Sequence, residues 1–432
     1  MKYKEYPKYK DSGVEWIRKI PEEWQVKKLK FILDMPVSDG PHETPVFQDS
    51  GIPFFSVDNI QNNKLFLEKL RFITKEDHKR FSLKCKPQKN DLLLGKAASV
   101  GKIALVDLDS EFNVWSPLAV IRVSQLEMLP KFCYFMFRSD FLQLQISLKV
   151  NWNTQGNIGM KDIENLKIII PSKIEQEQII NFLDKNTTQF DKLITKSKKQ
   201  ITILEEKRQA TINQAVTKGL DPSVKMKDSD IEWTDKIPKH WNSRKLKYCI
   251  QLFSKKSIDN TGERPYVGLE NIESKTGKLI GELSVGFVGD SKLFEPRDVL
   301  FGKLRPYLAK AVLADFSGQS SGEILALRAE KIKPELLHQL VLSDGFIKTV
   351  NSLTYGAKMP RAEWGLIGNI RIPLTPEKEQ DEIIDFIKTQ TTQFDELASK
   401  IQKQITLLEE KKEALITAAV TGKIDVRDSV GA

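Results

Sequence analysis

The feature that most constrains the fold of this 432-residue chain is an internal repeat. Residues 10–30 read KDSGVEWIRKIPEEWQVKKLK and residues 227–247 read KDSDIEWTDKIPKHWNSRKLK, with 12 identities in 21 positions. A second pair of blocks, residues 200–221 and 404–425, has 13 identities in 22 positions. Repetition on this scale predicts two copies of one structural unit rather than a single large core.

The residues between the repeated blocks are far less alike than the blocks themselves. The first pair of blocks is offset by 217 residues and the second by 204, so the intervening part is 13 residues shorter in the second copy. Each copy is therefore a similar frame around a divergent insert. A similar frame indicates a shared structural role, and a divergent insert indicates two different targets. The alternative is a plain duplication whose inserts drifted.

Two long helices are predicted at the ends of the two copies, each containing a TTQFD motif. From Phe190 and again from Phe394, residues recur at alternating steps of four and three, which is the pattern of a coiled-coil seam. One helix cannot bury such a stripe alone, so we expect the two helices to pack on each other within the chain. The expected seam residues include Phe190, Ile194, Ile201 and Leu204 in the first helix, and Phe394, Ile401, Ile405 and Leu408 in the second.

These patterns predict an α+β fold: two α/β domains and two long antiparallel coiled-coil helices, related by an internal pseudo-two-fold repeat. Short β-type runs in the first insert support its mixed character, for example Leu92 to Leu94 and Ile103 to Val106. The expected boundaries are a first domain at 1–165 with frame segment 10–30, a central helix at 172–218, a linker at 219–230, a second domain at 227–370 with frame segment 227–247, and a C-terminal helix at 376–422.

The composition narrows the class of protein. Lys and Arg number 67 against 58 Asp and Glu, so basic surface must be concentrated locally if the partner is a polyanion. The three cysteines are odd in number and unpaired in spacing, which argues against a disulfide framework or a zinc ribbon and fits a reducing compartment. The chain has no run of apolar residues long enough to span a bilayer, so we expect a soluble, cytoplasmic protein.

No catalytic constellation is evident, and we expect a protein without enzymatic activity. The stretch GKAASVGKI at 95–103 resembles a phosphate-binding loop, but five residues separate its glycines and Ile103 replaces the magnesium-binding hydroxyl. The Glu-Glu-Lys runs at 205–207 and 409–411 lie on the predicted helices, where a solvated face explains them better than a nuclease site. The four histidines are scattered without metal-ligand spacing, so no metal is expected.

The inserts do hold basic, aromatic and amide residues in short glycine-containing stretches. Lys and Arg bind phosphates, whereas Asn, Gln, Arg and Ser read base edges. Any one of these stretches alone is better explained as an ordinary surface turn, and their occurrence in both inserts is what favours DNA. The candidate DNA-contacting residues are Lys96, Ser99, Lys102, Trp115, Asn151, Asn153 and Gln155 in the first insert, and Lys255, Lys256, Lys303, Arg305, Tyr307, Lys358 and Arg361 in the second.

The whole pattern resembles the specificity subunits of type I restriction–modification systems. The resemblance lies in the DSGVEW…IPEEW opening and its second copy, the EQEQIINFLD block, the TTQFDxLI helices and the AVTKGLD close. It implies that each insert is a target-recognition domain for one half of a split double-stranded DNA site. One departure is Lys239-His240, which replaces Glu22-Glu23 in the second frame.

The resemblance also implies the partners. The helices would hold the two recognition domains apart, so that the DNA between the half-sites has no specified sequence. They would also dock two modification subunits, which methylate adenine. Restriction or translocase subunits would join them in the full complex. S-adenosylmethionine, ATP and Mg would belong to those partners and not to this chain. The competing hypotheses are an enzyme carrying its own nuclease or methyltransferase site and a coiled-coil adaptor that binds proteins without DNA specificity.

Overall fold

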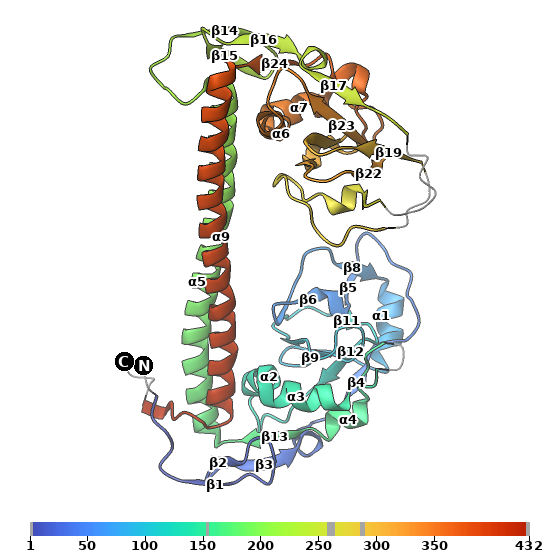
Figure 1. Ribbon diagram of the computed structural model, residues 1–432. Helices are drawn as coiled ribbons and strands as arrows, with labels where there is room; N and C mark the ends of the chain where they lie inside the picture. Colours follow the sequence, from blue (N-terminus) through green and yellow to red (C-terminus); the bar gives the residue numbers. More distant parts are fainter. Residues whose placement is uncertain (1–2, 153–154, 257–263, 286–289, 429–432) are drawn as a thin grey trace. The chain divides into compact units, whose positions relative to one another are not determined.

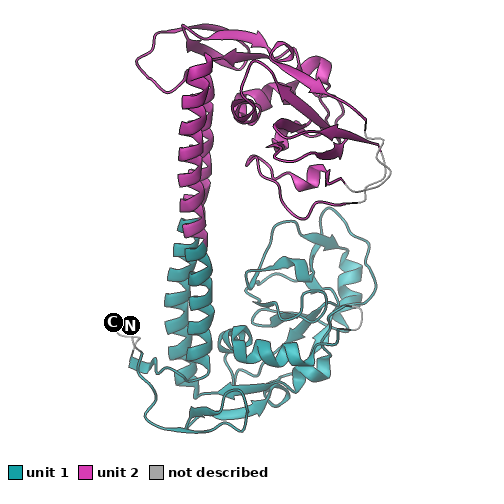
Figure 2. Cartoon of the chain, viewed as in Figure 1, with its two compact units in different colours: residues 1–197, 403–432 teal, residues 198–402 magenta. Residues whose placement is uncertain are grey.

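The computed structural model describes residues 3–152, 155–256, 264–285 and 290–428. The chain divides into two units, one formed by residues 1–197 and 403–432 and the other by residues 198–402 (Figure 2). We call them unit 1 and unit 2. Asn153 is one of the candidate DNA-contacting residues and lies outside the described residues.

Two long helices supply a segment to each unit (Figure 1). They are α5 (Lys173–Lys218) and α9 (Glu377–Val420). In unit 1, Ile179 of α5 shares a core with Ile416 of α9, and further along α5 Asp191 Oδ1 lies 2.9 Å from Lys412 Nζ. Residue numbers rise along α5 while they fall along α9, so the two helices are antiparallel as predicted.

Both helices end where the sequence places a glycine. Gly219 and Gly422 adopt φ values of 74° and 72°, the left-handed conformation that closes many helices. Each glycine also lies against its frame, because a Cβ on Gly422 would meet Pro21 Cδ at 2.4 Å and one on Gly219 would meet Trp241 Cζ2 at 3.3 Å. The helix ends therefore require glycine both for conformation and for space.

Unit 1 contains a frame and an insert. The frame has the hairpin β1 (Tyr9–Asp11) and β2 (Lys19–Pro21), and β3 (Gln25–Lys28) pairs antiparallel with β13 (Lys167–Ile170) directly before α5. Among the described residues the insert has a four-stranded antiparallel sheet of β10 (Ile103–Leu105), β9 (Leu92–Gly95), β12 (Leu118–Ile121) and β4 (Ser38–Asp39). Its other elements are the strands β5 (Ile52–Phe55), β6 (Ile60–Gln61), β7 (Lys64–Leu65), β8 (Arg71–Ile73) and β11 (Asn113–Val114), and the helices α1 (Lys75–Ser82), α2 (Pro130–Arg138), α3 (Asp140–Lys149) and α4 (Met160–Glu164).

Unit 2 repeats this arrangement. Its frame has the hairpin β14 (Met226–Ile231) and β15 (Thr234–Pro238), and β16 (Asn242–Lys245) pairs with β24 (Arg371–Leu374) directly before α9. Its described residues form a four-stranded sheet in the matching order, β21 (Ala311–Leu313), β20 (Asp298–Gly302), β23 (Ile324–Ala329) and β17 (Ile250–Phe253). The remaining elements are β18 (Tyr266–Val267), β19 (Ser291–Phe294), β22 (Gly318–Ser321), α6 (Pro334–Val341), α7 (Asp344–Ser352) and α8 (Trp364–Ile367).

The two inserts differ in a second, smaller sheet. In unit 1 the order is β11-β5-β8, with β8 on the β5 side. In unit 2 the order is β18-β22-β19, with β19 on the β22 side. Since β18 corresponds to β5 and β22 to β11, the third assigned strand lies at opposite edges among the described residues, and the β18 edge instead carries an isolated bridge between Tyr266 and Ser284. The predicted α+β fold with two related units is confirmed.

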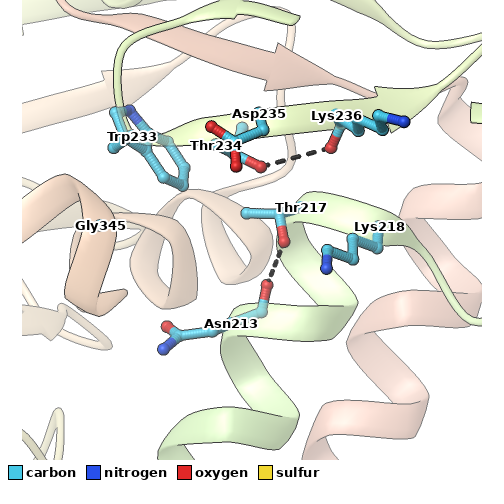
Figure 3. A pocket seen from close by; sticks show the side chains of 8 residues that line it. All are labelled: Asn213, Thr217, Lys218, Trp233, Thr234, Asp235, Lys236 and Gly345. Carbon is cyan, nitrogen blue, oxygen red and sulfur yellow. Dashed lines mark hydrogen bonds between the residues drawn. The ribbon is translucent and has the colours of Figure 1, made fainter. Parts of the chain in front are cut away.

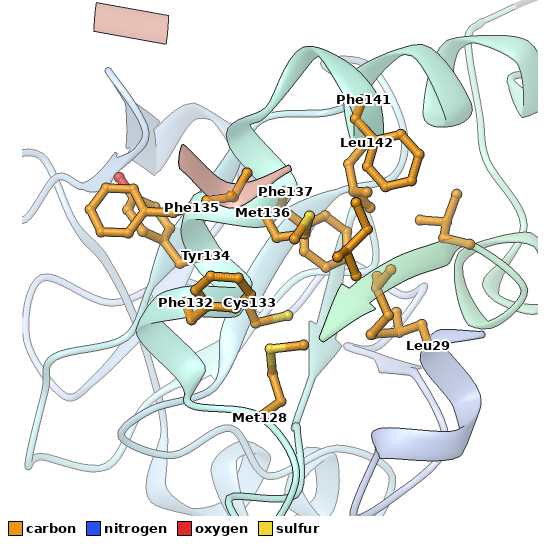
Figure 4. Packing of buried hydrophobic residues seen from close by; sticks show 14 of the residues in the cluster. Leu29, Met128, Phe132, Cys133, Tyr134, Phe135, Met136, Phe137, Phe141 and Leu142 are labelled. Carbon is orange, nitrogen blue, oxygen red and sulfur yellow. The ribbon is translucent and has the colours of Figure 1, made fainter. Parts of the chain in front are cut away.

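The largest core of unit 1 is built around α2 (Figure 4). Residues Phe132 to Phe137 are six consecutive buried positions, so this helix is apolar all round rather than on one stripe. Such a helix must be covered on all sides. Leu29 of the frame and Met128 join the same cluster, so the frame and the insert of unit 1 share one core.

The strand β14 begins near the expected start of the second frame. It pairs with β15 from Met226 onward, within the range 219–230 expected as linker and one residue before the frame segment expected from 227. Five of the six β14 residues are wholly or partly exposed.

Candidate nucleic-acid interface

Both units bring together two loops that are about fifty residues apart in the sequence. In unit 1, isolated β-bridges join Ala97 and Asn151 to Asn157. In unit 2, isolated β-bridges join Leu304 and Tyr355 to Arg361. We call these the paired loops: residues 96–102 with 151–152 and 155–157 in unit 1, and residues 303–310 with 355–361 in unit 2.

The same backbone hydrogen bond closes the paired loops in each unit. The amide of Ile158 donates to Lys96 O at 2.9 Å, and the amide of Ala362 donates to Lys303 O at 3.0 Å. The sequences of the two sets of loops are unrelated apart from the Gly-Lys at their start, at 95–96 and 302–303. The fold therefore presents different side chains from one common loop geometry, as a pair of readers with different targets requires.

A strained residue occupies the same position in both units. Ala98 has φ 63° and Arg305 has φ 50°, and neither is glycine. The left-handed conformation costs a residue with a side chain about 1–2 kcal/mol. The amide of Arg305 donates to Pro360 O at 2.7 Å, which fixes the strained residue against the second loop. Strain of this kind concentrates at functional sites.

Unit 1 exposes a large aromatic side chain on its paired loops. Trp152 is 74% exposed, and its ring lies over Gly156, where a Cβ would be only 2.8 Å from Trp152 Cζ3. Lys102, Asn151 and Gln155 are also exposed. Trp152 was not among the candidate residues, although its neighbours were. An exposed indole within an amide-rich loop is the signal that points to it.

Lys96 has a different environment from the one expected of a phosphate contact. It is only 8% exposed, and its Nζ lies 3.1 Å from Oδ2 of the buried Asp39. Lys84 Nζ lies 2.5 Å from the other Asp39 oxygen. Burial tends to raise the pKa of Asp39, but the hydrogen bonds from Lys84 and Lys96 outweigh it and leave the pKa below its usual value. The structure thus places Lys96 in a buried ion pair with Asp39 instead of on the surface.

Two further candidates of unit 1 are partly covered. Trp115 is half-buried, with its ring centroid 6.3 Å from that of Phe54 and 6.4 Å from that of Phe47. Ser99 is half-buried at the turn of the first loop, where its amide donates to Ala97 O. The ring of Trp115 stabilises the smaller sheet, so any contact with DNA involves only its exposed edge.

The candidates of unit 2 gather on and beside the paired loops. Tyr307 and Lys358 are exposed, whereas Lys303 and Arg305 are half-buried. Among the described residues, no ion pair within 4 Å joins Lys303 or Arg305 to a carboxylate. Arg361 differs, because its Nη2 lies 2.8 Å from Glu323 Oε1.

Lys255 and Lys256 follow β17 and are exposed. The structure places them beside β19, because Lys255 O accepts a hydrogen bond from the amide of Leu293, and Lys256 forms a bridge with Lys292. Lys292 was missed in the sequence, where it is a single lysine in a short strand with no distinguishing pattern.

The repeated TTQFD motif ties the long helices to the inserts. In unit 1, the Asp191 carboxylate lies 3.3 Å from Lys64 Nζ of the insert and 2.9 Å from Lys412 Nζ of α9. In unit 2, the equivalent Asp395 carboxylate lies 2.6 Å from Lys278 Nζ of the insert. Burial tends to raise the pKa of Asp191, but its lysine partners hold that pKa below the usual value. The motif is therefore structural and is present in both copies for the same reason.

The predicted seam positions are all covered in the long helices. None of the eight is exposed: Ile194 and Ile405 are buried, and Phe190, Ile201, Leu204, Phe394, Ile401 and Leu408 are half-buried. The Glu-Glu-Lys runs at 205–207 and 409–411 are fully exposed, as a solvated helix face requires. Glu409 and Glu410 line an open hollow together with other acidic residues, and no lysine is among its lining residues.

Each frame has a hollow beside its hairpin. In unit 2 a pocket of about 440 Å³ lies between the end of α5 and β15, lined by residues that include Asn213, Trp233 and Lys236 (Figure 3). In unit 1 a hollow of about 410 Å³ lies beside the equivalent hairpin, lined by residues that include Val14 and Arg18. The hollow of unit 1 is lined by frame residues, whereas the pocket of unit 2 is also lined by Gly345 of the insert helix α7.

Several other features limit the chemistry. Within the described parts of the chain, His, Cys, Asp and Glu form no cluster of three that would hold a metal ion. The same residues include no helix that is both long and apolar enough to cross a bilayer. Cys85, Cys133 and Cys249 are buried free thiols. The stretch at 95–103 connects two strands of one hairpin, β9 and β10, and so lacks the helix that a phosphate-binding loop precedes.

Comparison with known proteins gives a consistent result. The family described as type I restriction modification DNA specificity domain matches residues 21–203. The type I restriction enzyme MjaVIII specificity subunit of Methanocaldococcus jannaschii is 27% identical over 67% of this chain and 71% of its own length. The type I restriction enzyme EcoDI specificity subunit of Escherichia coli is 21% identical over 76% of this chain and 77% of its own.

The fold is also similar to a solved structure. A chain in a structural study of complex assembly and conformational transition of the type I R-M system superposes with a TM-score of 0.67. The two chains are 15% identical, and the match covers 94% of this chain and 99% of the other. The similarity extends across both frames and both inserts.

Proposed function

The chain belongs to the specificity subunits of type I restriction–modification systems, and we propose that each of its two units reads one half of a bipartite DNA site. The observation that carries this proposal is the recurrence of the paired loops. Both units hold a strained residue at the same loop position, but the residue is Ala98 in one and Arg305 in the other. A common geometry with different side chains is how one fold addresses two sequences.

The proposal assigns a role to each segment. Residues 1–165 and 227–370 are the recognition domains, and the helices at 172–218 and 376–422 separate the half-sites by bases that are not read. A helix surface of Lys, Glu and small apolar residues makes few base-specific contacts, so the bases between the half-sites stay unspecified. The adaptor alternative without DNA specificity finds no support among the relatives.

We assign partner binding to the repeated frames. Two modification subunits would dock, one on each frame, because the frames retain similar sequences and each has a hollow beside its hairpin. The chain itself is the non-catalytic subunit of its complex. S-adenosylmethionine, ATP and Mg would be bound by the partner subunits, including any restriction subunit, and the complex would act in the cytoplasm.

The test is methyl transfer from labelled S-adenosylmethionine to DNA. The purified chain alone should incorporate no label, and the chain combined with its modification subunit should label DNA at a specific sequence. Label incorporated by the isolated chain would contradict the non-catalytic assignment. A complex that methylates without sequence preference would contradict the recognition function.

A further inference from the structure

In the part of unit 2 that the structure describes, a group of lysines lies together without an ion pair to a carboxylate. Lys256 and Lys292 lie directly opposite each other in an antiparallel bridge between β19 and the segment after β17. Residues paired in this way place their side chains on the same face of the sheet, and like charges in such a pair are destabilising. Among the described residues, no ion pair within 4 Å joins either lysine to an acidic group.

Lys303 of the paired loops adds a third positive charge. The backbone amide of Lys303 donates to Glu323 O at 2.9 Å. Glu323 follows directly after strand β22, and Ser320 of that strand is paired with Lys292. Lys303 is therefore held close to Lys292. Burial lowers the pKa of Lys292, and the nearby charge of Lys303 lowers it further, while Glu323 opposes both. The ammonium groups of Lys292 and Lys303 are therefore close enough to repel each other.

The nearby carboxylate is already engaged. Glu323 Oε1 pairs with Arg361 Nη2 at 2.8 Å, and the geometry of the chain brings no lysine of this group within 4 Å of it. We call Lys256, Lys292 and Lys303 the lysine group. Three adjacent cations carry an electrostatic cost in the free protein, and a polyanion would relieve it.

We propose that the lysine group binds backbone phosphates of the DNA and so anchors unit 2 next to the half-site that its paired loops read. This proposal rests on the proposed function and adds to it a division of roles. The lysine group supplies affinity that does not depend on sequence, and the other residues of the paired loops recognise the bases.

Unit 1 lacks this arrangement at the equivalent position. Lys96 corresponds to Lys303, but it is buried and paired with Asp39. The equivalent lysine of unit 1 is thus neutralised by the protein, and we expect phosphate anchoring at this position from unit 2 alone.

The experiment measures the salt dependence of DNA binding by the complete complex of this chain with its modification subunits. The probe is a duplex that carries the motif methylated by the wild-type complex. Each phosphate contact contributes about 0.9 to the slope of log K against log salt concentration. We expect Lys292→Gln to lower the slope by about 0.9 and the double variant Lys292→Gln/Lys303→Gln by about 1.8. Between about 50 and 200 mM salt, each lost contact reduces the salt-induced fall in affinity roughly 3-fold.

The control variant is Lys331→Gln. Lys331 is exposed and follows the C-terminal end of β23, where Arg328 is paired with Asp298. At the other end of β23, Ile324 is paired with Gly302, the residue before Lys303. It therefore lies beyond the other end of the same sheet, and its removal should leave the slope unchanged.

Two results would overturn the proposal. An unchanged slope in the double variant would show that the lysine group does not contact phosphates, and a change in the letters of the methylated motif would show that it reads bases. Thermal unfolding of the variants provides a second readout, since removing mutually repelling charges should not lower stability, and a loss of stability would contradict the repulsion on which the argument depends. Failure of the proposed function would be seen separately, as a wild-type complex without sequence-specific methylation.

Discussion

Replacing Arg305 with glycine should separate the stability of unit 2 from its DNA binding. Arg305 adopts φ 50° and ψ 61°, a left-handed conformation that costs about 1–2 kcal/mol for a residue with a side chain. Glycine adopts this conformation without strain but loses about 0.5–1 kcal/mol more in backbone entropy on folding. The net change lies between about zero and a stabilisation of about 1.5 kcal/mol, which corresponds to a rise of up to roughly 3–6 °C in the Tm of a domain of this size.

The same substitution removes a guanidinium that no ion pair within 4 Å engages in the described structure. A bidentate arginine contact to guanine contributes about 1–3 kcal/mol of discrimination. Arg305→Gly should therefore weaken binding of the methylated motif by roughly 5- to 150-fold and relax one position in one half of it. The assays are differential scanning calorimetry of the chain and methylome sequencing of cells that carry the variant complex.

The matched control is Ala98→Gly in unit 1. Ala98 has φ 63° at the equivalent loop position but no charged side chain. It should show the gain in stability without the loss of binding. If Arg305→Gly instead lowered the Tm, the side chain would be a support of the loop. If binding and letters were both unchanged, the residue would lie outside the interface.

Three further predictions follow from the same structure. Trp152→Ala should weaken DNA binding by about tenfold, because stacking of the exposed ring on a base would contribute about 1–3 kcal/mol, and it should change the Tm little. Unchanged affinity in a fluorescence titration would exclude this contact. Insertion of one heptad after Leu204 adds about 10 Å to α5 and keeps its apolar stripe nearly in register. Methylome sequencing should then show the same specified bases with an unspecified gap longer by up to about three base pairs. Altered bases with the original gap would refute the spacer role of the helices. Lys84 and Lys96 lower the pKa of Asp39 despite its burial, so the stabilisation from the ionised Asp39 is present at neutral pH and is lost as the pH falls through that lowered pKa. Asp39→Asn should therefore lower the Tm at neutral pH and make the fall of the Tm in acid less steep. An unchanged dependence of the Tm on pH would contradict the ion-pair assignment.

The long helices and the repeat were predictable because their signals are local. Heptad spacing and helix-ending glycines such as Gly219 act over one or two turns, and the structure places every expected seam residue at a covered position. The duplication itself predicted that the second copy would supply the partner stripe. A few of the short strands were visible as well, since Leu92 to Leu94 lies in β9 and Ile103 to Val106 overlaps β10.

The environment of the individual lysines was not predictable in this way. Lys96 and Lys303 both follow a strand and a glycine, and the sequence gives no reason to separate them. What separates them is Asp39, which lies 57 residues before Lys96 and is brought beside it by the pairing of β4 with β12. Lys292 was missed for the same reason, because its neighbours come from other strands. Such contacts depend on the tertiary fold and leave no periodic signal.

The central claim is that two independent units read two halves of one DNA site. The most direct measurement is methylome sequencing of cells in which residues 31–165 of this chain are replaced by the corresponding insert of another specificity subunit. The wild-type complex should methylate a motif with two specified parts and an unspecified gap, and the chimaera should change the letters of one part while the gap and the other part stay the same. A change in both parts together, or a motif without a gap, would contradict the account.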